Sequence, residues 1–137
     1  RASAAPSSLP NLGGRRVLVI DDDETIRHAM RLLLTGWGCE CRTAASLEEA
    51  LHQEAAAPAL ILCDYRLREG RNGTEAIACL RTHFGADIPA LLVTGDTAPS
   101  RLREASASGI PLLHKPVAAL ALHQALVAAL DGTSDRR

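Results

Sequence analysis

The stretch Val17-Leu-Val-Ile-Asp-Asp-Asp-Glu-Thr-Ile-Arg27 decides the fold. Its first four residues, Val17–Ile20, are all apolar and predict a short strand buried on both faces. Three acids follow this strand directly, and an apolar stripe at helical spacing then runs from Ile26 to Leu34. The stretch therefore predicts one βα unit with acidic side chains where the strand ends.

The same order of strand and helix recurs along the rest of the chain. The further expected strands are Cys39–Ala44, Ala59–Cys63, Pro89–Val93 and Ile110–Leu113; the further expected helices are one opened by the capping box Ser46–Glu49, Thr74–Thr82, Pro99–Ser106 and Val117–Leu130. Five such units predict an α/β fold, a doubly wound five-stranded parallel sheet with helices on both faces. We expect a linker at residues 1–14, one domain at 15–131 and a polar tail at 132–137.

Composition narrows the classes of function. A net charge of −1 and an aromatic content of 2% argue against a nucleic-acid-binding surface. No apolar run is long enough to span a membrane and no signal peptide is visible, so we expect a cytoplasmic domain. The cysteines form no CxxC pair and are expected to be free buried thiols; they are Cys39, Cys41, Cys63 and Cys79.

Polar residues stand at four of the five strand ends. The first strand is followed by Asp21–Asp23, the third by Asp64, the fourth by Thr94 and the fifth by Lys115, the only lysine of the chain. In a parallel sheet these positions meet at the carboxyl edge, where ligands of such folds bind. Acids alone at a strand end are often only a favourable helix N-terminus, but here four ends carry complementary groups.

The residue types suit phosphoryl transfer. Carboxylates converging on one edge repel each other unless a cation lies among them, and oxygen ligands suit Mg²⁺. A carboxylate is also a nucleophile toward phosphorus, while a lysine supplies a positive charge and a threonine a hydrogen bond. Such positioning and charge neutralisation is most of what phosphoryl transfer requires of a protein.

Four stretches together resemble the receiver domains of two-component signalling: VLVIDDDETIR, LILCDYRLREGRNGTEAI, ALLVTGD and LLHKP. They extend from Val17 to Pro116. The resemblance implies a flavodoxin-like fold with strand order 2-1-3-4-5. It also implies a phosphohistidine donor, either a histidine kinase or a histidine phosphotransfer domain, and slow autodephosphorylation. The receiver itself would catalyse the transfer.

The resemblance also assigns roles to individual residues. Asp64 would be the phosphorylated residue, and Thr94 and Lys115 would contact the phosphoryl group. Mg²⁺ would be held by Asp64, by the metal-binding acids Asp21 and Asp22, and by the backbone carbonyl of Arg66. Lys115-Pro116 is expected to be a cis peptide.

The sequence departs from the family pattern at two places. Leu112 stands where many members have an aromatic residue that turns inward on activation, and the stretch Arg66–Gly73 lacks the usual Met-Pro. The sequence Arg66–Gly73, together with the ending Leu-Leu-His-Lys-Pro, looks most like receivers at the C-terminus of hybrid histidine kinases. The linker-like beginning and an initial Arg1 in place of Met agree with a parent kinase chain, although a stand-alone receiver stays open.

Two further expectations and one alternative complete the sequence reading. The last helix, Val117–Leu130, is apolar around most of its circumference, which favours a homodimer or a contact with the parent kinase. Arg66 and Asp96 are expected to form a salt bridge over the phosphoryl group and slow its loss.

The alternative is a phosphatase of the haloacid dehalogenase type, whose opening motif Asp-x-Asp-x-Thr begins at Asp21 and makes that residue the nucleophile.

Overall fold

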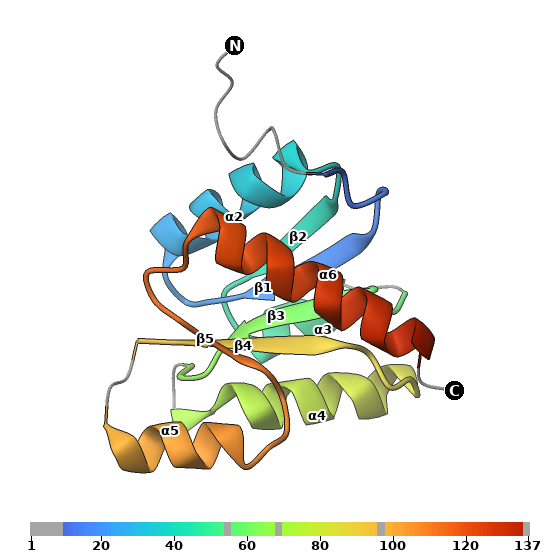
Figure 1. Cartoon of the computed structure of the whole chain (residues 1–137). Coiled ribbons are helices and arrows are strands. Elements are labelled where there is room, and N and C mark those ends of the chain that lie inside the picture. Colours follow the sequence, from blue (N-terminus) through green and yellow to red (C-terminus); the bar gives the residue numbers. More distant parts are fainter. Residues whose placement is uncertain (1–9, 54–55, 68–69, 96–97, 136–137) are drawn as a thin grey trace.

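Strands and helices alternate along the chain in the computed structural model, which describes residues 10–53, 56–67, 70–95 and 98–135 (Figure 1). The elements are β1 (Arg16–Ile20), α2 (Glu24–Gly36), β2 (Glu40–Ala44), α3 (Leu47–Gln53), β3 (Leu60–Asp64), α4 (Gly73–Phe84), β4 (Ala90–Thr94), α5 (Pro99–Ser106), β5 (Leu112–His114) and α6 (Ala119–Asp135).

The strands form one five-stranded sheet in the order β2-β1-β3-β4-β5. Every pairing is parallel. The chain thus moves outward from β1 to one edge, crosses back, and builds toward the other edge, as in flavodoxin-like folds. The predicted fold class and strand order are confirmed.

Alternate residues of each strand enter two different cores. Val17 and Val19 of β1 pack with α2 and α6 on one face of the sheet. Leu18 and Ile20 pack with α3, α4 and α5 on the other face (Figure 1). This alternation follows from the two-residue repeat of a strand, and it explains why the central strands are apolar without interruption. All five residues of β3 and of β4 are buried.

The last strand and the last helix differ from their expected limits. β5 begins at Leu112 rather than Ile110, because Pro111 has no N–H to donate and joins the sheet only by accepting a bond from the nitrogen of Leu92. Helix α6 runs from Ala119 to Asp135 and so includes most of the expected tail. The limits of linker, domain and tail stay predictions.

Helix α6 turns its large apolar side chains toward the sheet. Leu122, Leu126 and Leu130 are buried in the core beside α2. Leu120 is 55% exposed and is the only large apolar side chain that α6 exposes in the described part of the chain. The apolar circumference that the sequence indicated is therefore used mainly inside this domain.

Residues just before β1 are attached to the domain. Nε2 of His123 in α6 donates to the carbonyl of Pro10 at 2.8 Å, and the nitrogen of Leu12 donates to the carbonyl of Trp37 at 2.7 Å. The rings of Trp37 and His123 meet edge to face at 4.9 Å. Pro10–Leu12 therefore pack against the C-terminal end of α2 and the first turns of α6. Residues 1–9 of the expected linker lie outside the described part of the chain.

Side chains cap the starts of α2, α3 and α4, whereas α5 begins after Ala98 without a side-chain cap. Half of the predicted capping box before α3 is present: Oγ of Ser46 accepts from the nitrogen of Glu49, but the Glu49 carboxylate accepts from the nitrogen of Ala45 rather than from that of Ser46. A second capping box, Asn72 with Glu75, opens α4 and was not predicted. In the described part of the chain, no helix has the length and apolarity that crossing a membrane requires.

Candidate functional site

The carboxyl edge of the sheet gathers the polar residues that the sequence singled out. Asp21 follows β1, Asp64 ends β3, Thr94 ends β4 and Lys115 follows β5. Asp21, Asp64 and Thr94 are buried, and Lys115 is half-buried. Buried acids need a partner, because removing a charge from water is costly unless the charge is compensated.

Lys115 compensates two of these acids at once. Its Nζ lies 3.1 Å from Oδ2 of Asp21 and 3.3 Å from Oδ2 of Asp64. The backbone nitrogen of Lys115 donates to the carbonyl of Thr94 at 2.8 Å, which fixes the start of its side chain relative to β4. The peptide Lys115-Pro116 is cis, as the resemblance implied. One ammonium group therefore bridges the ends of β1 and β3.

Three carboxylates lie together at this edge. One oxygen from each of Asp21, Asp22 and Asp64 lies within 4.8 Å of the others. These are hard oxygen ligands with a net negative charge, and they come from two adjacent strand ends. Such a set fits Mg²⁺, which binds through a few carboxylates and keeps several waters.

Asp23, the third acid of the run, has a different role. Its Oδ1 accepts from the nitrogen of Thr25 at 2.9 Å and caps α2. Its backbone nitrogen donates to Oδ1 of Asp21 at 2.9 Å. The sequence allowed either a metal site or a helix start for these acids; the structure gives Asp23 to the helix start and places Asp21 and Asp22 beside Asp64.

Negative charge is in excess at the site. Burial raises the pKa of Asp64 to about 6, the Asp21 carboxylate adds to this effect, and Lys115 opposes it. Burial alone would lower the pKa of Lys115, but Asp64 and Asp21 outweigh it and raise the pKa overall. The ammonium therefore stays protonated and does not fully offset the acids, which leaves room for a further cation.

Gly73 allows the chain to pack closely behind Asp64. A Cβ atom at Gly73 would lie 2.6 Å from the carbonyl oxygen of Asp64 and 2.7 Å from Cδ2 of Leu92. Its nitrogen donates to the carbonyl of Tyr65 at 2.6 Å. No side chain fits at this position, so Gly73 supports the site from behind, a role that sequence reasoning missed.

The remaining expectations at this edge concern the loop after β3. Arg66 is exposed and forms an isolated bridge with Asn72. The role of its carbonyl as a metal ligand stays a prediction. Asp96 lies outside the described residues, and with it the expected salt bridge to Arg66. Leu112, which replaces the family's aromatic residue, is half-buried and packs against the core beneath α4.

Sequence reasoning also missed Arg27. This residue lies in α2, and its Nη1 donates to the backbone carbonyl of Asp21 at 2.7 Å. The side chain is half-buried. An arginine one turn into the helix that follows an acidic strand end was the available signal, because side chains of the first turns lean toward the helix start.

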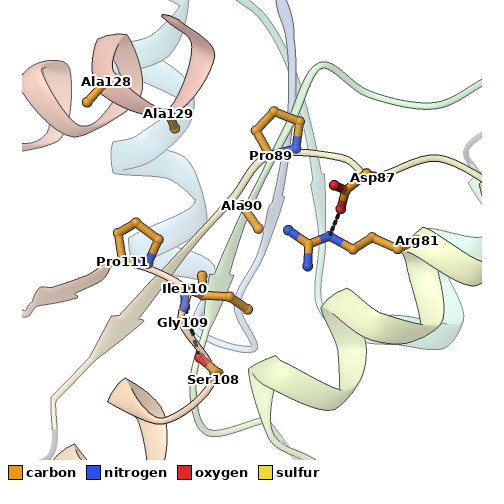
Figure 2. Close-up of a pocket in the computed structure, with 10 residues that line it drawn as sticks. All are labelled: Arg81, Asp87, Pro89, Ala90, Ser108, Gly109, Ile110, Pro111, Ala128 and Ala129. Carbon is orange, nitrogen blue, oxygen red and sulfur yellow. Dashed lines mark hydrogen bonds and ion pairs between the residues drawn. The ribbon is translucent and has the colours of Figure 1, made fainter. Parts of the chain in front are cut away.

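A pocket of about 590 Å³ lies elsewhere on the domain. Pro89 and Pro111, which precede β4 and β5, line it, so it opens at the amino edge of the sheet (Figure 2). Figure 2 shows the guanidinium of Arg81 paired with Asp87, with Nε 3.8 Å from Oδ1. This pocket is at the opposite edge from Asp64 and takes no part in the site.

The comparison with protein families decides what this arrangement is. A sequence model of the response regulator receiver domain matches residues 17–127. The chain belongs to this family. The match includes all five strands except Arg16 at the start of β1, together with the acids, threonine and lysine at the carboxyl edge, so the resemblance predicted from the four motifs is confirmed. The chain is a receiver domain of two-component signalling.

Two curated relatives are sensor proteins. Ethylene receptor 2 of Oryza sativa subsp. japonica is 29% identical over 131 residues, which cover 90% of this chain and 17% of that protein. The CAI-1 autoinducer sensor kinase/phosphatase CqsS of Vibrio cholerae is 34% identical over 99 residues, which cover 70% of this chain and 14% of that protein. The chain spans less than a fifth of the length of either relative.

Solved structures agree on the fold. The chemotaxis protein CheY4 of Vibrio cholerae is 29% identical, with a TM-score of 0.73, and the match covers 85% of this chain and 98% of that chain. A CheY-like receiver domain protein of Methanospirillum hungatei JF-1 is 25% identical with a TM-score of 0.77, and the match covers 90% and 98%.

Proposed function

We propose that this receiver is the phosphoacceptor of a two-component phosphorelay and that Asp64 takes the phosphoryl group. The observation that carries the proposal is the position of Lys115 Nζ, 3.1 Å from Asp21 and 3.3 Å from Asp64. The nucleophile thus lies beside a metal-binding acid and a fixed positive charge, at the edge where ligands of such sheets bind.

Transfer of the phosphoryl group requires the protein to form a single covalent bond, at Asp64. A carboxylate oxygen of Asp64 forms the new bond to phosphorus as the phosphorus–nitrogen bond of phosphohistidine breaks, and the imidazole leaves with the electron pair and takes up a proton. Lys115 would move from the Asp64 carboxylate to a phosphoryl oxygen, and the hydroxyl of Thr94 would donate to another. Slow hydrolysis of the aspartyl phosphate would reset the domain.

Mg²⁺ fits the oxygen atoms present at this edge. Asp21, Asp22 and Asp64 would hold it, together with the backbone carbonyl of Arg66. When bound, it would neutralise charge on the phosphoryl oxygens. The proximity of the three carboxylates supports this assignment, since their mutual repulsion is relieved by a divalent cation.

The donor is a histidine kinase or a histidine phosphotransfer domain. A groove of about 480 Å³ beside Lys115 offers it a place, lined by Ile26, Ala29, Met30, Leu33, Lys115, Pro116 and Val117. The groove is mostly apolar and lies next to the phosphoryl site, so a donor helix seated there would carry its histidine close to Asp64.

The likeness to sensor proteins supports a place in a larger cytoplasmic assembly. CqsS is named a sensor kinase/phosphatase, and this chain would serve as the receiver of such a hybrid kinase. Contact with the parent kinase, or with a second copy, through α6 would centre on the exposed Leu120. No observation favours the haloacid dehalogenase alternative over the receiver family.

The test is phosphorylation by acetyl phosphate with Mg²⁺, read by intact mass and peptide mapping. We expect one phosphoryl group on Asp64; it should not form when EDTA removes Mg²⁺ before acetyl phosphate is added, and it should be absent from Asp64→Asn. Asp87→Asn, which changes an exposed acid at the opposite edge, is the control and should label like the parent protein. A label on Asp21 would instead support the phosphatase alternative.

A further inference from the structure

We propose that Arg27 is a positioning residue for the Mg²⁺ ligands Asp21 and Asp22. The inference rests on the proposed function, because it requires that these acids bind the cation. Arg27 donates to the backbone carbonyl of Asp21, so it acts on the backbone that carries the two carboxylates.

The position of Arg27 in α2 explains why its guanidinium can contact the backbone of Asp21. Its backbone nitrogen donates to the carbonyl of Asp23 at 3.0 Å, in the first turn of the helix. Helical side chains lean toward the N-terminus, so the guanidinium returns toward the acidic turn that precedes the helix. There Nη1 donates to the carbonyl of Asp21 at 2.7 Å.

This bond completes the hydrogen bonding of Asp21. Its nitrogen donates to the carbonyl of Ala44 at 3.1 Å, and its Oδ1 accepts from the nitrogen of Asp23 at 2.9 Å. Its Oδ2 pairs with Lys115 at 3.1 Å. The carbonyl is the remaining polar atom of this buried residue, and it accepts from Nη1 of Arg27. Without Arg27 that carbonyl would be buried and unsatisfied, which favours rotation of the peptide.

The same carbonyl belongs to the peptide that joins Asp21 to Asp22. Rotation of this peptide would change where the Asp22 side chain starts, and would also move the backbone on which the Asp21 carboxylate is mounted. Because Mg²⁺ demands close to ideal octahedral geometry, a displaced carboxylate weakens its binding. Arg27 therefore holds the spacing between two ligands that come from adjacent residues.

Charge and positioning make opposite predictions for loss of Arg27. Arg27 is itself a cation near the acidic cluster, so charge alone predicts that its removal tightens Mg²⁺ binding. Positioning predicts weaker binding. The sign of the change therefore distinguishes the two effects without any assumption about their sizes.

The test is Mg²⁺ affinity of the unphosphorylated protein, measured by isothermal titration calorimetry, in Arg27→Met. This change keeps the aliphatic stem and removes the hydrogen bond and the charge. We expect about tenfold weaker binding, the scale seen when a partner that orients a metal ligand is lost. Equal or tighter binding in the folded variant would overturn the proposal.

Arg31→Met is the matched control. Arg31 lies one turn further along α2 and also donates to a backbone carbonyl, that of Cys41 at 3.2 Å, and to Oγ1 of Thr43 at 3.0 Å. The substitution Arg31→Met removes the same charge from the same helix but keeps the hydrogen bond from Arg27 to the Asp21 carbonyl, so Mg²⁺ binding should not weaken. Weakening as large as in Arg27→Met would also overturn the proposal.

Two further outcomes are separable. If Arg27→Met does not fold, as judged by circular dichroism, Arg27→Ala removes the same hydrogen bond and the same charge and carries the same expectation. If the parent protein itself binds no Mg²⁺, the metal assignment of the proposed function fails and the role of Arg27 falls with it. If the parent binds Mg²⁺ and the Arg27 variants bind it as well or better, only the positioning role fails.

Discussion

Nζ of Lys115 lies 3.3 Å from Oδ2 of Asp64 across the carboxyl edge of the sheet. Both groups are removed from water to a large extent, so each shifts the pKa of the other: Lys115 lowers that of Asp64 and Asp64 raises that of Lys115. The raised pKa of Lys115 keeps the ammonium protonated beside Asp64, the proposed nucleophile. The ammonium of Lys115 would therefore pair with the Asp64 carboxylate before transfer and with a phosphoryl oxygen after it.

The first prediction concerns the reactivity of this amine. Lys115 is the only lysine, so a peptide that contains it reports one ammonium group. Beryllofluoride with Mg²⁺, bound at Asp64 as a phosphoryl mimic, should cover Nζ and slow its reaction with an amine-selective reagent. The rate is measured by mass spectrometry of the digested protein.

Asp64→Asn serves as the control for this labelling, because it should not bind the mimic and should label equally with and without it. Equal rates with and without beryllofluoride in the parent protein would argue that Lys115 does not contact the phosphoryl group.

The second prediction concerns Gly73. Gly73→Ala places a Cβ 2.6 Å from the carbonyl oxygen of Asp64 and 2.7 Å from Leu92, so the backbone must move. We expect a loss of about 1–3 kcal/mol in the free energy of unfolding, the usual cost of overpacking. Phosphorylation of Asp64 should also slow. Urea unfolding and the acetyl phosphate assay measure the two effects.

Gly36→Ala is the matched change, since a Cβ built there meets no heavy atom within 4 Å beyond its chain neighbours and the backbone of its own helix. Helical alanine should be neutral or stabilise the protein by up to about 1 kcal/mol. If both alanine variants behave alike, the close contact behind Asp64 has no energetic consequence.

The strand ends were predictable from the sequence because the sheet is parallel. Once Val17–Ile20, Ala59–Cys63 and the later apolar runs were identified as strands, topology alone brought Asp21, Asp64 and Lys115 to one edge. No distance was needed for that inference. The fold class followed from the same alternation of strand and helix.

Contacts that depend on three-dimensional packing were not predictable. The bond from Arg27 to the Asp21 carbonyl requires the crossing angle of α2 over β1, and the contact at Gly73 requires the closeness of α4 to β3. Apolar periodicity in α6 likewise could not distinguish a surface face from a core face, because the neighbouring helix α2 covers part of it.

The third prediction separates neighbouring acids. Asp23 caps α2 through its bond from the nitrogen of Thr25, so Asp23→Ala should cost about 1 kcal/mol of stability. Mg²⁺ binding should change little. Asp22→Asn should do the reverse and weaken Mg²⁺ binding with little loss of stability. Thermal unfolding and calorimetric titration of both variants would show whether the two roles are separate; loss of Mg²⁺ binding in Asp23→Ala would contradict the division.

The last prediction concerns the thiols. Cys39, Cys41 and Cys63 are buried as expected, but the expectation was wrong for Cys79, which lies on α4 and is exposed. Burial also raises the pKa of the Cys41 thiol to about 11 and raises that of Cys63 further, so near neutral pH both stay protonated. Because the thiolate is the reactive form, an alkylating reagent should modify Cys79 quickly and the other three slowly.

Mass spectrometry of the native protein during alkylation measures this difference directly. Cys79→Ser should abolish the fast step and leave stability unchanged, because the side chain points to solvent. Denaturant should make all four thiols react at similar rates. Fast modification of Cys63 in the native protein would place an opening beside Asp64, since its Sγ donates to the Asp64 carbonyl at 3.4 Å, and would contradict the closed core between β3 and α4.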